Sequence, residues 1–324
     1  MIVELPDTTT SQVSKTLVKI REEGGVVALG RVLTLVIATM HDGEEEAIEA
    51  ANDASREHPM RVIVVSTEDD DDADDSADGS RIDAEIRVGG DAGASEVIIL
   101  RARGDAAQDE QSLVMGLLLP DAPVVTWWPG AAPAVPGDAP LGRIAQRRIT
   151  DASTQPDPQA ALDHLAGSYR PGDADFAWTR LTLWRAQLAA VLDQPPYESV
   201  TAVSVTGAVD SPSTTLLAAW LSMQLGAPAD CALTGLEHGS HGIHGVHLIR
   251  PNGRIELVRD HPGVATLRQP GQPVHDVALP RRSLRDCLAD ELRRLDPDEL
   301  YGEVITRGLT LVSQRPADDE GVTA

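Results

Sequence analysis

The segments RVLTLVIAT at 31–39, GEEEAIEAANDASRE at 43–57 and MRVIVVS at 60–66 indicate the fold class most directly. The first and third segments are apolar, β-branched runs, which are typical of strands buried on both faces of a parallel sheet. The middle segment is acidic at its start and alanine-rich afterwards, and it ends before Pro59, where a helix would have to stop. Strand, helix and strand in this order predict an α/β layer fold.

The same pattern extends over the rest of the chain. Two α/β domains are expected, each with a mixed or mostly parallel sheet flanked by helices: residues 1–165, and residues 166–324 with a polar tail from about 316. Residues 151–158 contain two prolines and are expected to be a linker. The expected helices are 11–23, 108–119, 176–192, 211–225, 283–295 and 298–307, and the expected strands are 82–88, 95–103, 122–128, 200–205, 264–279 and a hairpin of 243–250 with 253–259.

Charge excludes several classes of protein. The 324 residues carry 51 acidic and 27 basic side chains, a net charge of −24. A field of this sign disfavours binding to nucleic acid or to an anionic membrane surface. The only lysines are Lys15 and Lys19, which excludes a P-loop and any catalytic lysine later in the chain.

Targeting and cofactor signals are also missing. The N-terminus has no basic and apolar leader, and no apolar run approaches the length of a membrane helix, so we expect a cytoplasmic protein. Neither G-x-G-x-x-G after a strand nor G-x-S-x-G is present, and no cofactor is expected. Cys231 and Cys287 form no C-x-x-C, and two reduced thiols are favoured over a redox pair.

Two segments have the residue types of metal ligands. His238, His241, His244 and His247 recur every third residue, but intervening glycines disfavour a helix, so a strand and turn are preferred to a metal site. The acidic segment 68–79 is expected to be a solvated loop. Within and after it, a calcium-loop spacing is nearly matched, although the flanking strands do not fit an EF-hand and no metal is expected. The matching residues are Asp74, Ser76, Asp78, Gly79 and Glu85.

A second type of site is suggested at 207–215, where a strand and a glycine precede a Ser/Thr-rich helix start. Backbone amides and hydroxyls there could hold a phosphate, and plain helix capping needs the same residues. The anion-site candidates are Gly207, Ser211, Ser213 and Thr214.

Arginines and tryptophans are the remaining candidates. Arg143, Arg147 and Arg148 form one group, and Arg281, Arg282 and Arg285 form another; they either pair internally or bind a carboxylate or phosphate. Aromatic residues make up only 3% of the chain, so tryptophans are informative. Trp127 and Trp128 are either core residues or, if one face of the sheet is open, anchors for a partner.

Five segments in this order resemble the actinobacterial glucose-6-phosphate dehydrogenase assembly proteins, the OpcA family. The resemblance extends from about residue 30 to residue 308. The segments are LLLPDAPVVTWWPG at 117–130, PLGRIAQRRITDAS at 140–153, FAWTRLTLWRAQLA at 176–189, LLAAWLSMQLG at 216–226 and LRDCLADELRRLDPDELY at 284–301.

The resemblance implies a two-domain α/β protein without catalytic residues. Such proteins associate with glucose-6-phosphate dehydrogenase and promote its active oligomer, which supports the oxidative pentose phosphate pathway and NADPH supply. The dehydrogenase itself has an Asp-His-Tyr-x-Gly-Lys segment, whereas this chain has Asp260-His261-Pro262-Gly263 and no lysine there. Some cyanobacterial members are under redox control through cysteines, and only Cys231 and Cys287 are available here.

We therefore expect a non-catalytic activator whose partner is glucose-6-phosphate dehydrogenase. Trp127, Trp128 and Trp184 are the candidate anchors at its interface, since they lie in the segments that most resemble the family. An alternative is a sugar-phosphate-binding enzyme or sensor that uses the helix start at 207–215, and a further alternative is a scaffold for a different partner.

Overall fold

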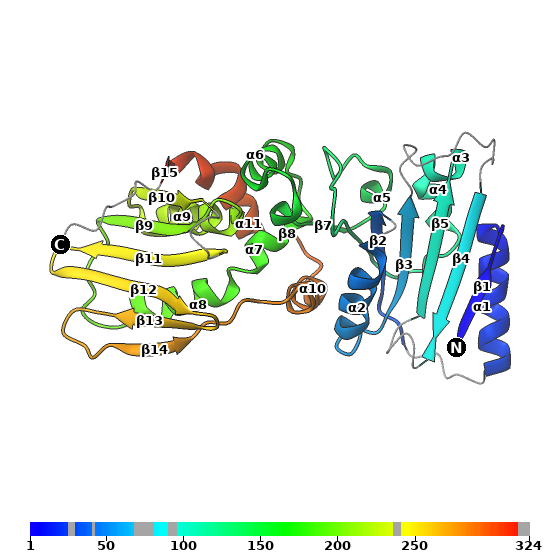
Figure 1. Cartoon of the computed structure of the whole chain (residues 1–324), viewed down its shortest axis with the longest axis horizontal. Coiled ribbons are helices and arrows are strands. Elements are labelled where there is room, and N and C mark those ends of the chain that lie inside the picture. Colours follow the sequence, from blue (N-terminus) through cyan, green and yellow to red (C-terminus); the bar gives the residue numbers. More distant parts are fainter. Residues whose placement is uncertain (25–29, 41–42, 68–80, 90–95, 236–240, 317–324) are drawn as a thin grey trace. The chain divides into compact units, whose positions relative to one another are not determined.

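In the computed structural model the chain forms two compact units (Figure 1). Unit 1 comprises Met1–Thr154, Gly172–Ala174 and Ser283–Pro297, and unit 2 comprises Gln155–Pro171, Asp175–Arg282 and Asp298–Ala324. The expected domain boundary between residues 165 and 166 stays a prediction. The structure describes residues 1–24, 30–40, 43–67, 81–89, 96–235 and 241–316.

Unit 1 contains an eight-stranded sheet with the order β1-β4-β5-β3-β2-β6-β7-β8. Strands β5, β3, β2, β6 and β7 are parallel neighbours, and β4 and β1 join antiparallel at one edge. The buried runs at 33–40 and 60–67 lie side by side in its centre, as their β-branched composition predicted. The strands are β1 (Ile2–Leu5), β2 (Leu33–Met40), β3 (Met60–Thr67), β4 (Arg81–Val88), β5 (Glu96–Arg103), β6 (Val124–Trp127), β7 (Arg147–Thr150) and β8 (Asp173–Asp175).

The helices of unit 1 include one from late in the chain. The expected helix at 108–119 is shorter in the structure, because it ends at Met115 and Gly116 follows as its C-cap. Its start is fixed by Asp109, whose carboxylate accepts a hydrogen bond from the backbone N–H of Ser112 at 3.1 Å. The helices are α1 (Thr10–Gly24), α2 (Glu44–Ala54), α3 (Asp105–Gln108), α4 (Glu110–Met115), α5 (Pro140–Arg143) and α10 (Leu284–Arg293).

A buried ion pair attaches α10 to the sheet of unit 1. Arg147 on β7 donates from Nε to the Glu291 carboxylate at 2.7 Å, and from Nη1 to the Asp296 carbonyl at 2.9 Å. Both charged side chains are almost completely buried. Helix α10 also packs on α2, with an exposed ion pair between Arg293 and Glu57 at 2.9 Å. These contacts place residues 283–297 in the same compact unit as the N-terminal half of the chain.

Unit 2 contains a seven-stranded mixed sheet with the order β14-β13-β12-β11-β9-β10-β15. Strands β9, β10 and β15 are parallel, and β11 to β14 add antiparallel strands. The predicted hairpin is confirmed as β11 with β12. The strands are β9 (Ala202–Ala208), β10 (Ala229–Thr234), β11 (Ile243–Arg250), β12 (Gly253–His261), β13 (Val264–Arg268), β14 (His275–Ala278) and β15 (Val312–Pro316).

The helices of unit 2 cover one face of this sheet. Helix α9 ends at Gly226, which has φ +61° and makes the predicted glycine cap. The helices are α6 (Pro158–Ser168), α7 (Phe176–Thr179), α8 (Thr182–Leu192), α9 (Pro212–Leu225) and α11 (Glu299–Glu303), followed by the π-helical turn η6 (Val304–Gly308) and the 3₁₀ turn η7 (Leu309–Leu311).

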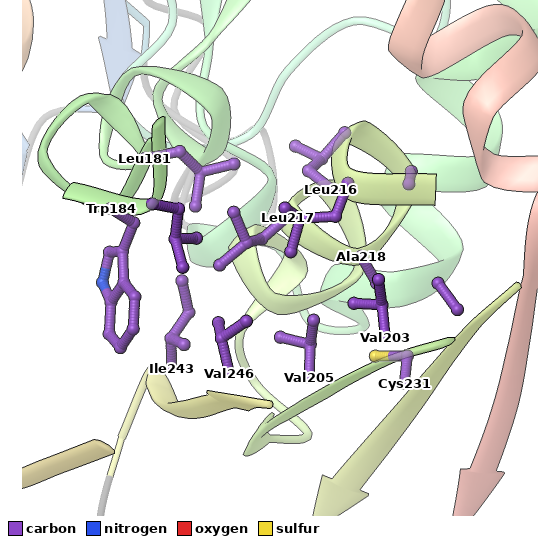
Figure 2. Packing of buried hydrophobic residues seen from close by; sticks show 14 of the residues in the cluster. Leu181, Trp184, Val203, Val205, Leu216, Leu217, Ala218, Cys231, Ile243 and Val246 are labelled. Carbon is purple, nitrogen blue, oxygen red and sulfur yellow. The ribbon is translucent and has the colours of Figure 1, made fainter. Parts of the chain in front are cut away.

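The core of unit 2 lies between these helices and the sheet. Figure 2 shows Leu181 and Trp184, at the start of α8, together with Leu217 of α9 above Val205 and Val246 of the strands. Helix α9 is apolar around most of its circumference, and most of its residues are buried. A helix of this kind forms the centre of a core rather than an amphipathic cover.

The structure departs from the expected elements at three further places. The helix expected at 176–192 breaks into α7 and α8, because the Thr179 carbonyl accepts from the Thr182 hydroxyl at 2.8 Å and from the Arg282 guanidinium at 2.9 Å. The expected linker at 151–158 ends in helix α6, whose N-cap Asp157 accepts from the Ala160 amide at 3.0 Å. Residues 312–316 form strand β15, which pairs with β10.

The Arg147–Glu291 pair generates a stability prediction. Arg147→Ala should lower the free energy of unfolding by about 3–5 kcal/mol, because it leaves the Glu291 charge buried without its partner. Arg293→Ala, in the exposed pair with Glu57, should cost less than about 1 kcal/mol. Urea unfolding followed by circular dichroism measures both. The double variant R147M/E291L should recover most of the loss, and equal costs for R147A and R293A would contradict the prediction.

Candidate partner interface and anion site

The outer face of the unit 2 sheet is the side opposite its helices. The buried side chains of the helices belong to the same core cluster as the inward-facing strand residues, among them Val205, Val246 and Leu257. Because side chains alternate along a strand, the residues between these point the other way. One row of cross-strand partners on the outer face consists of Ala232, Thr206, Gly245, Val258 and Thr266.

This row is small, neutral and flat. Its four side chains are half-buried, and Gly245 has none, so the strands present little relief. A second cross-strand row beside it mixes charges and polar groups. It consists of Asp230, Ser204, His247, Glu256 and Arg268. The row contains no charged side chain and the row beside it does, and depletion of charge is one feature of the centre of an interface with a polar rim.

One titratable group on the outer face has a shifted pKa. Burial lowers the pKa of His247, although the Glu256 carboxylate across the strand pair opposes the shift. The histidine is therefore held mainly neutral at pH 7, and Glu256 is paired instead with Arg254 at 2.5 Å. The predicted strands imply that side chains alternate between the two faces of the sheet, but the sequence did not show on which face the helices would pack.

The three candidate tryptophans are buried. Trp127 is 0% exposed, Trp128 5% and Trp184 2%. Trp128 packs in the core cluster of unit 1 and Trp184 in that of unit 2. The arrangement fits the core interpretation, since a buried indole offers no surface to a partner. Their role as interface anchors stays a prediction that their burial does not favour.

The helix start at 207–215 is closely packed rather than open. A Cβ on Gly207 would come within 2.2 Å of the Thr214 hydroxyl, so glycine is needed where β9 meets α9. Thr214 donates to the Ser211 hydroxyl at 3.0 Å, and Ser213 donates to the Ala177 carbonyl at 2.8 Å. The neighbouring Asp210 carboxylate would also repel an anion. The geometry favours close packing and internal hydrogen bonds at these four residues, and Ser211 makes no side-chain cap. The anion site there stays a prediction that the packing does not favour.

The metal candidates do not converge in the described part of the chain. No group of three His, Cys, Asp or Glu side chains there has a metal-site arrangement. His241 pairs with Asp210 at 2.7 Å, and His238 lies outside the described residues. The calcium-loop residues up to Gly79 also lie outside them, and Glu85 of β4 pairs with Arg87 at 2.6 Å.

Both cysteines are buried free thiols. Burial raises the pKa of the Cys231 thiol to about 11, and a contact of 3.8 Å with the Thr215 hydroxyl opposes part of the rise. A thiol that stays protonated reacts slowly.

The arginine groups divide into paired and unpaired members. Arg147 and Arg148 form buried pairs with Glu291 and Asp173, as internal pairing predicted. Arg285 lies 3.7 Å from Asp53. In contrast, Arg281 donates only to the His241 carbonyl and has no ion pair within the described residues. The sequence also gave no reason to single out Arg259, which lies near Arg281.

Two family models match the chain. Residues 51–167 match the glucose-6-phosphate dehydrogenase subunit N-terminal domain, and residues 171–305 match the C-terminal domain of the same subunit, both of the OpcA type. The two matches occur in the family's own order and together span most of the chain. The chain belongs to the OpcA family. Family membership accounts for the five resembling segments, all of which lie within 51–305.

Comparisons with individual proteins add little to this assignment. No curated protein matches the chain. A glucose-6-phosphate 1-dehydrogenase from Mycobacterium avium is 12% identical with a TM-score of 0.39, covering 88% of this chain and 94% of its own. An oxidoreductase from Pseudomonas syringae is 11% identical with a TM-score of 0.39, covering 88% and 92%. Similarity at this level says nothing about activity.

The helices of this OpcA-family chain can be compared with the length and hydrophobicity of a membrane-spanning helix. Within the described ranges, none of them combines the length and apolar character needed to cross a bilayer.

The burial of Trp184 leads to a stability prediction. Trp184→Ala should lower the free energy of unfolding by about 3–5 kcal/mol, because it leaves a cavity between α8 and the sheet. Chemical unfolding followed by circular dichroism gives the value. A loss below about 1 kcal/mol would be inconsistent with core packing, and Trp184 would again be a candidate anchor at a partner interface.

The pKa of Cys231 leads to a second prediction. In a Cys287→Ala background at pH 8, labelling of native Cys231 by a chromogenic disulfide should be at least about 100-fold slower than in denaturant, because both ionisation and access are suppressed. Absorbance of the released thiolate follows the rate. Native labelling as fast as the denatured control would show an accessible thiol and reopen a redox role.

Proposed function

We propose that this chain binds glucose-6-phosphate dehydrogenase as a non-catalytic subunit and promotes its active oligomer. The observation that carries the proposal is the pair of family matches, since both matched domains are described as parts of a subunit of that enzyme. In this role the chain supports entry into the oxidative pentose phosphate pathway and NADPH supply. A cytoplasmic location, expected from the sequence, is part of the same proposal.

The physical mechanism of activation is a population shift. If the dehydrogenase exists as an active and a less active assembly, a subunit that binds the active one more tightly raises its population. The size of the shift equals the difference between the two binding free energies. No catalytic group of this chain has to enter the active site of the enzyme.

The surface that we assign to this contact is the outer face of the unit 2 sheet. The helices of unit 2 share a core with the opposite face, which leaves the outer face available. The row Ala232, Thr206, Gly245, Val258 and Thr266 extends across five neighbouring strands. With about 4.8 Å between strands, the row is roughly 20 Å wide, which matches the centre of a standard interface. Its small side chains lose little conformational entropy when they are covered.

A titration of this protein into purified dehydrogenase of the same organism tests the function directly. NADP reduction and the mass of the complex are followed together. Saturable activation with a rise in mass supports the proposal and gives the stoichiometry. If neither quantity changes, the proposed function is wrong.

A substitution on the outer face tests the docking surface. Ala232→Arg should weaken binding to the dehydrogenase about tenfold or more, because a long charged side chain at this end of the row has to be desolvated when the partner covers the face. Val18→Arg, at a residue of α1 that is 48% exposed, adds the same charge elsewhere and is the matched control. Equal affinities for the two variants would exclude this face, while the function itself would still be judged by the titration.

A further inference from the structure

Among the described residues, two arginines at one corner of unit 2 have no carboxylate partner. Arg259, near the end of β12, donates from Nη2 to the Leu279 carbonyl at 2.8 Å. Arg281 follows two residues after Leu279 and donates to the carbonyl of His241, just before β11. Because β11 and β12 are paired, these bonds bring both guanidinium groups to the same end of the sheet. Neither arginine takes part in an ion pair within the described residues.

Arg259 is held in a partly dry environment. Its guanidinium carbon lies 5.1 Å from the centre of the Trp184 ring, which covers one side of it. Its Nε is buried and has no hydrogen-bond partner in the described part of the chain. Burial, and then the like charge of Arg281, lower the pKa of Arg259 from its ordinary value to about 10. The surroundings therefore disfavour the charged form of Arg259. The unpartnered Nε is also unusual, because a buried donor normally has an acceptor.

Two neighbouring cations distinguish this corner from the sites of the buried arginines. Arg147, Arg148 and Arg61 each have a carboxylate at ion-pair distance, and the buried Arg250 donates to the Pro196 carbonyl. In a chain with 51 acidic residues, partners are abundant, and yet two neighbouring cations at this corner have none in the described residues. Two adjacent unpaired guanidinium groups repel each other, and an anion bound between them would remove that cost.

We propose that Arg259 and Arg281 form a binding site for the phosphoryl group of inorganic phosphate or of a phosphate monoester. Each planar guanidinium presents donors in a fork that matches the oxygens of a phosphoryl group. A phosphoryl dianion balances two cations, whereas a single carboxylate would leave one charge uncompensated. The Arg259 guanidinium and the donors of Arg281 other than the one bound to the His241 carbonyl are the groups that would bind the oxygens.

The surroundings explain why the site is here and not at the neighbouring helix start. Gly242, just before β11, contacts the end of β9, since the Ala208 amide donates to the Gly242 carbonyl at 2.9 Å. Asp210 at that helix start faces His241, and its negative charge opposes an anion there. The arginine corner lies on the other side of His241, whose carbonyl accepts from Arg281. The two arginines thus lie at the corner and not at the Ser/Thr cluster.

Calorimetric titration of the whole chain at constant ionic strength tests the site. The probes are inorganic phosphate and glucose 6-phosphate, with glucose as the control that lacks a phosphoryl group. Arg259→Gln and Arg281→Gln should each weaken binding roughly tenfold or more, because each removes charge-assisted hydrogen bonds. Arg254→Gln is the matched control, since it removes a positive charge at the other end of the same strand, where Arg254 is already paired with Glu256.

The outcomes separate the possible ligands. Binding of inorganic phosphate alone indicates a free-phosphate site, and tighter binding of the ester indicates a phosphorylated metabolite. The proposal is wrong if no probe binds at about 10 mM, or if the two arginine variants bind as tightly as R254Q. Should Arg259→Gln fail to fold, the exposed Arg281 still allows the test. The measurement uses this chain alone, so its failure would not affect the proposed binding to the dehydrogenase.

Discussion

The buried ion pair between Arg147 and Glu291 is the interaction on which unit 1 depends. A charge of either sign inside a protein is costly unless it is paired and hydrogen-bonded. Arg147 meets this requirement with the Glu291 carboxylate and with the Asp296 carbonyl, two groups that are more than 140 residues away in sequence. Neither side chain can be buried and paired before residues 283–297 have packed against β7. Completion of unit 1 is therefore coupled to the synthesis and folding of residues 283–297.

This coupling changes how the two units should be understood. Unit 1 uses three segments of the chain and unit 2 uses the segments between and after them. The chain therefore passes between the units several times, and each unit is completed only when the other has been traversed. A simple cut would remove α10 from β7 and leave the Arg147 charge buried without its partner. Truncated forms would thus report on a damaged core as well as on a missing domain.

Much of the fold could be predicted from local pattern. The β-branched runs at 31–39 and 60–66 are central strands, and Gly226 ends its helix as expected, because both signals act within a few residues. The break at residues 180–181 could not be predicted in this way. It depends on the Arg282 side chain reaching the Thr179 carbonyl across about a hundred residues of sequence. The membership of α10 in unit 1 has the same kind of origin.

The candidate sites divide along the same line. Tryptophans and Ser/Thr clusters are conspicuous in a sequence, but Trp184 and Thr214 are buried because the core of unit 2 requires their volume or hydroxyl. The features that remain available are inconspicuous in sequence. The outer row of small residues follows from strand register, and the corner of Arg259 and Arg281 follows from tertiary contacts that give neither arginine a carboxylate partner among the described residues. Function in this molecule is therefore best sought on the outer sheet face and at the two arginines, which the core does not use, rather than at its rarest residues.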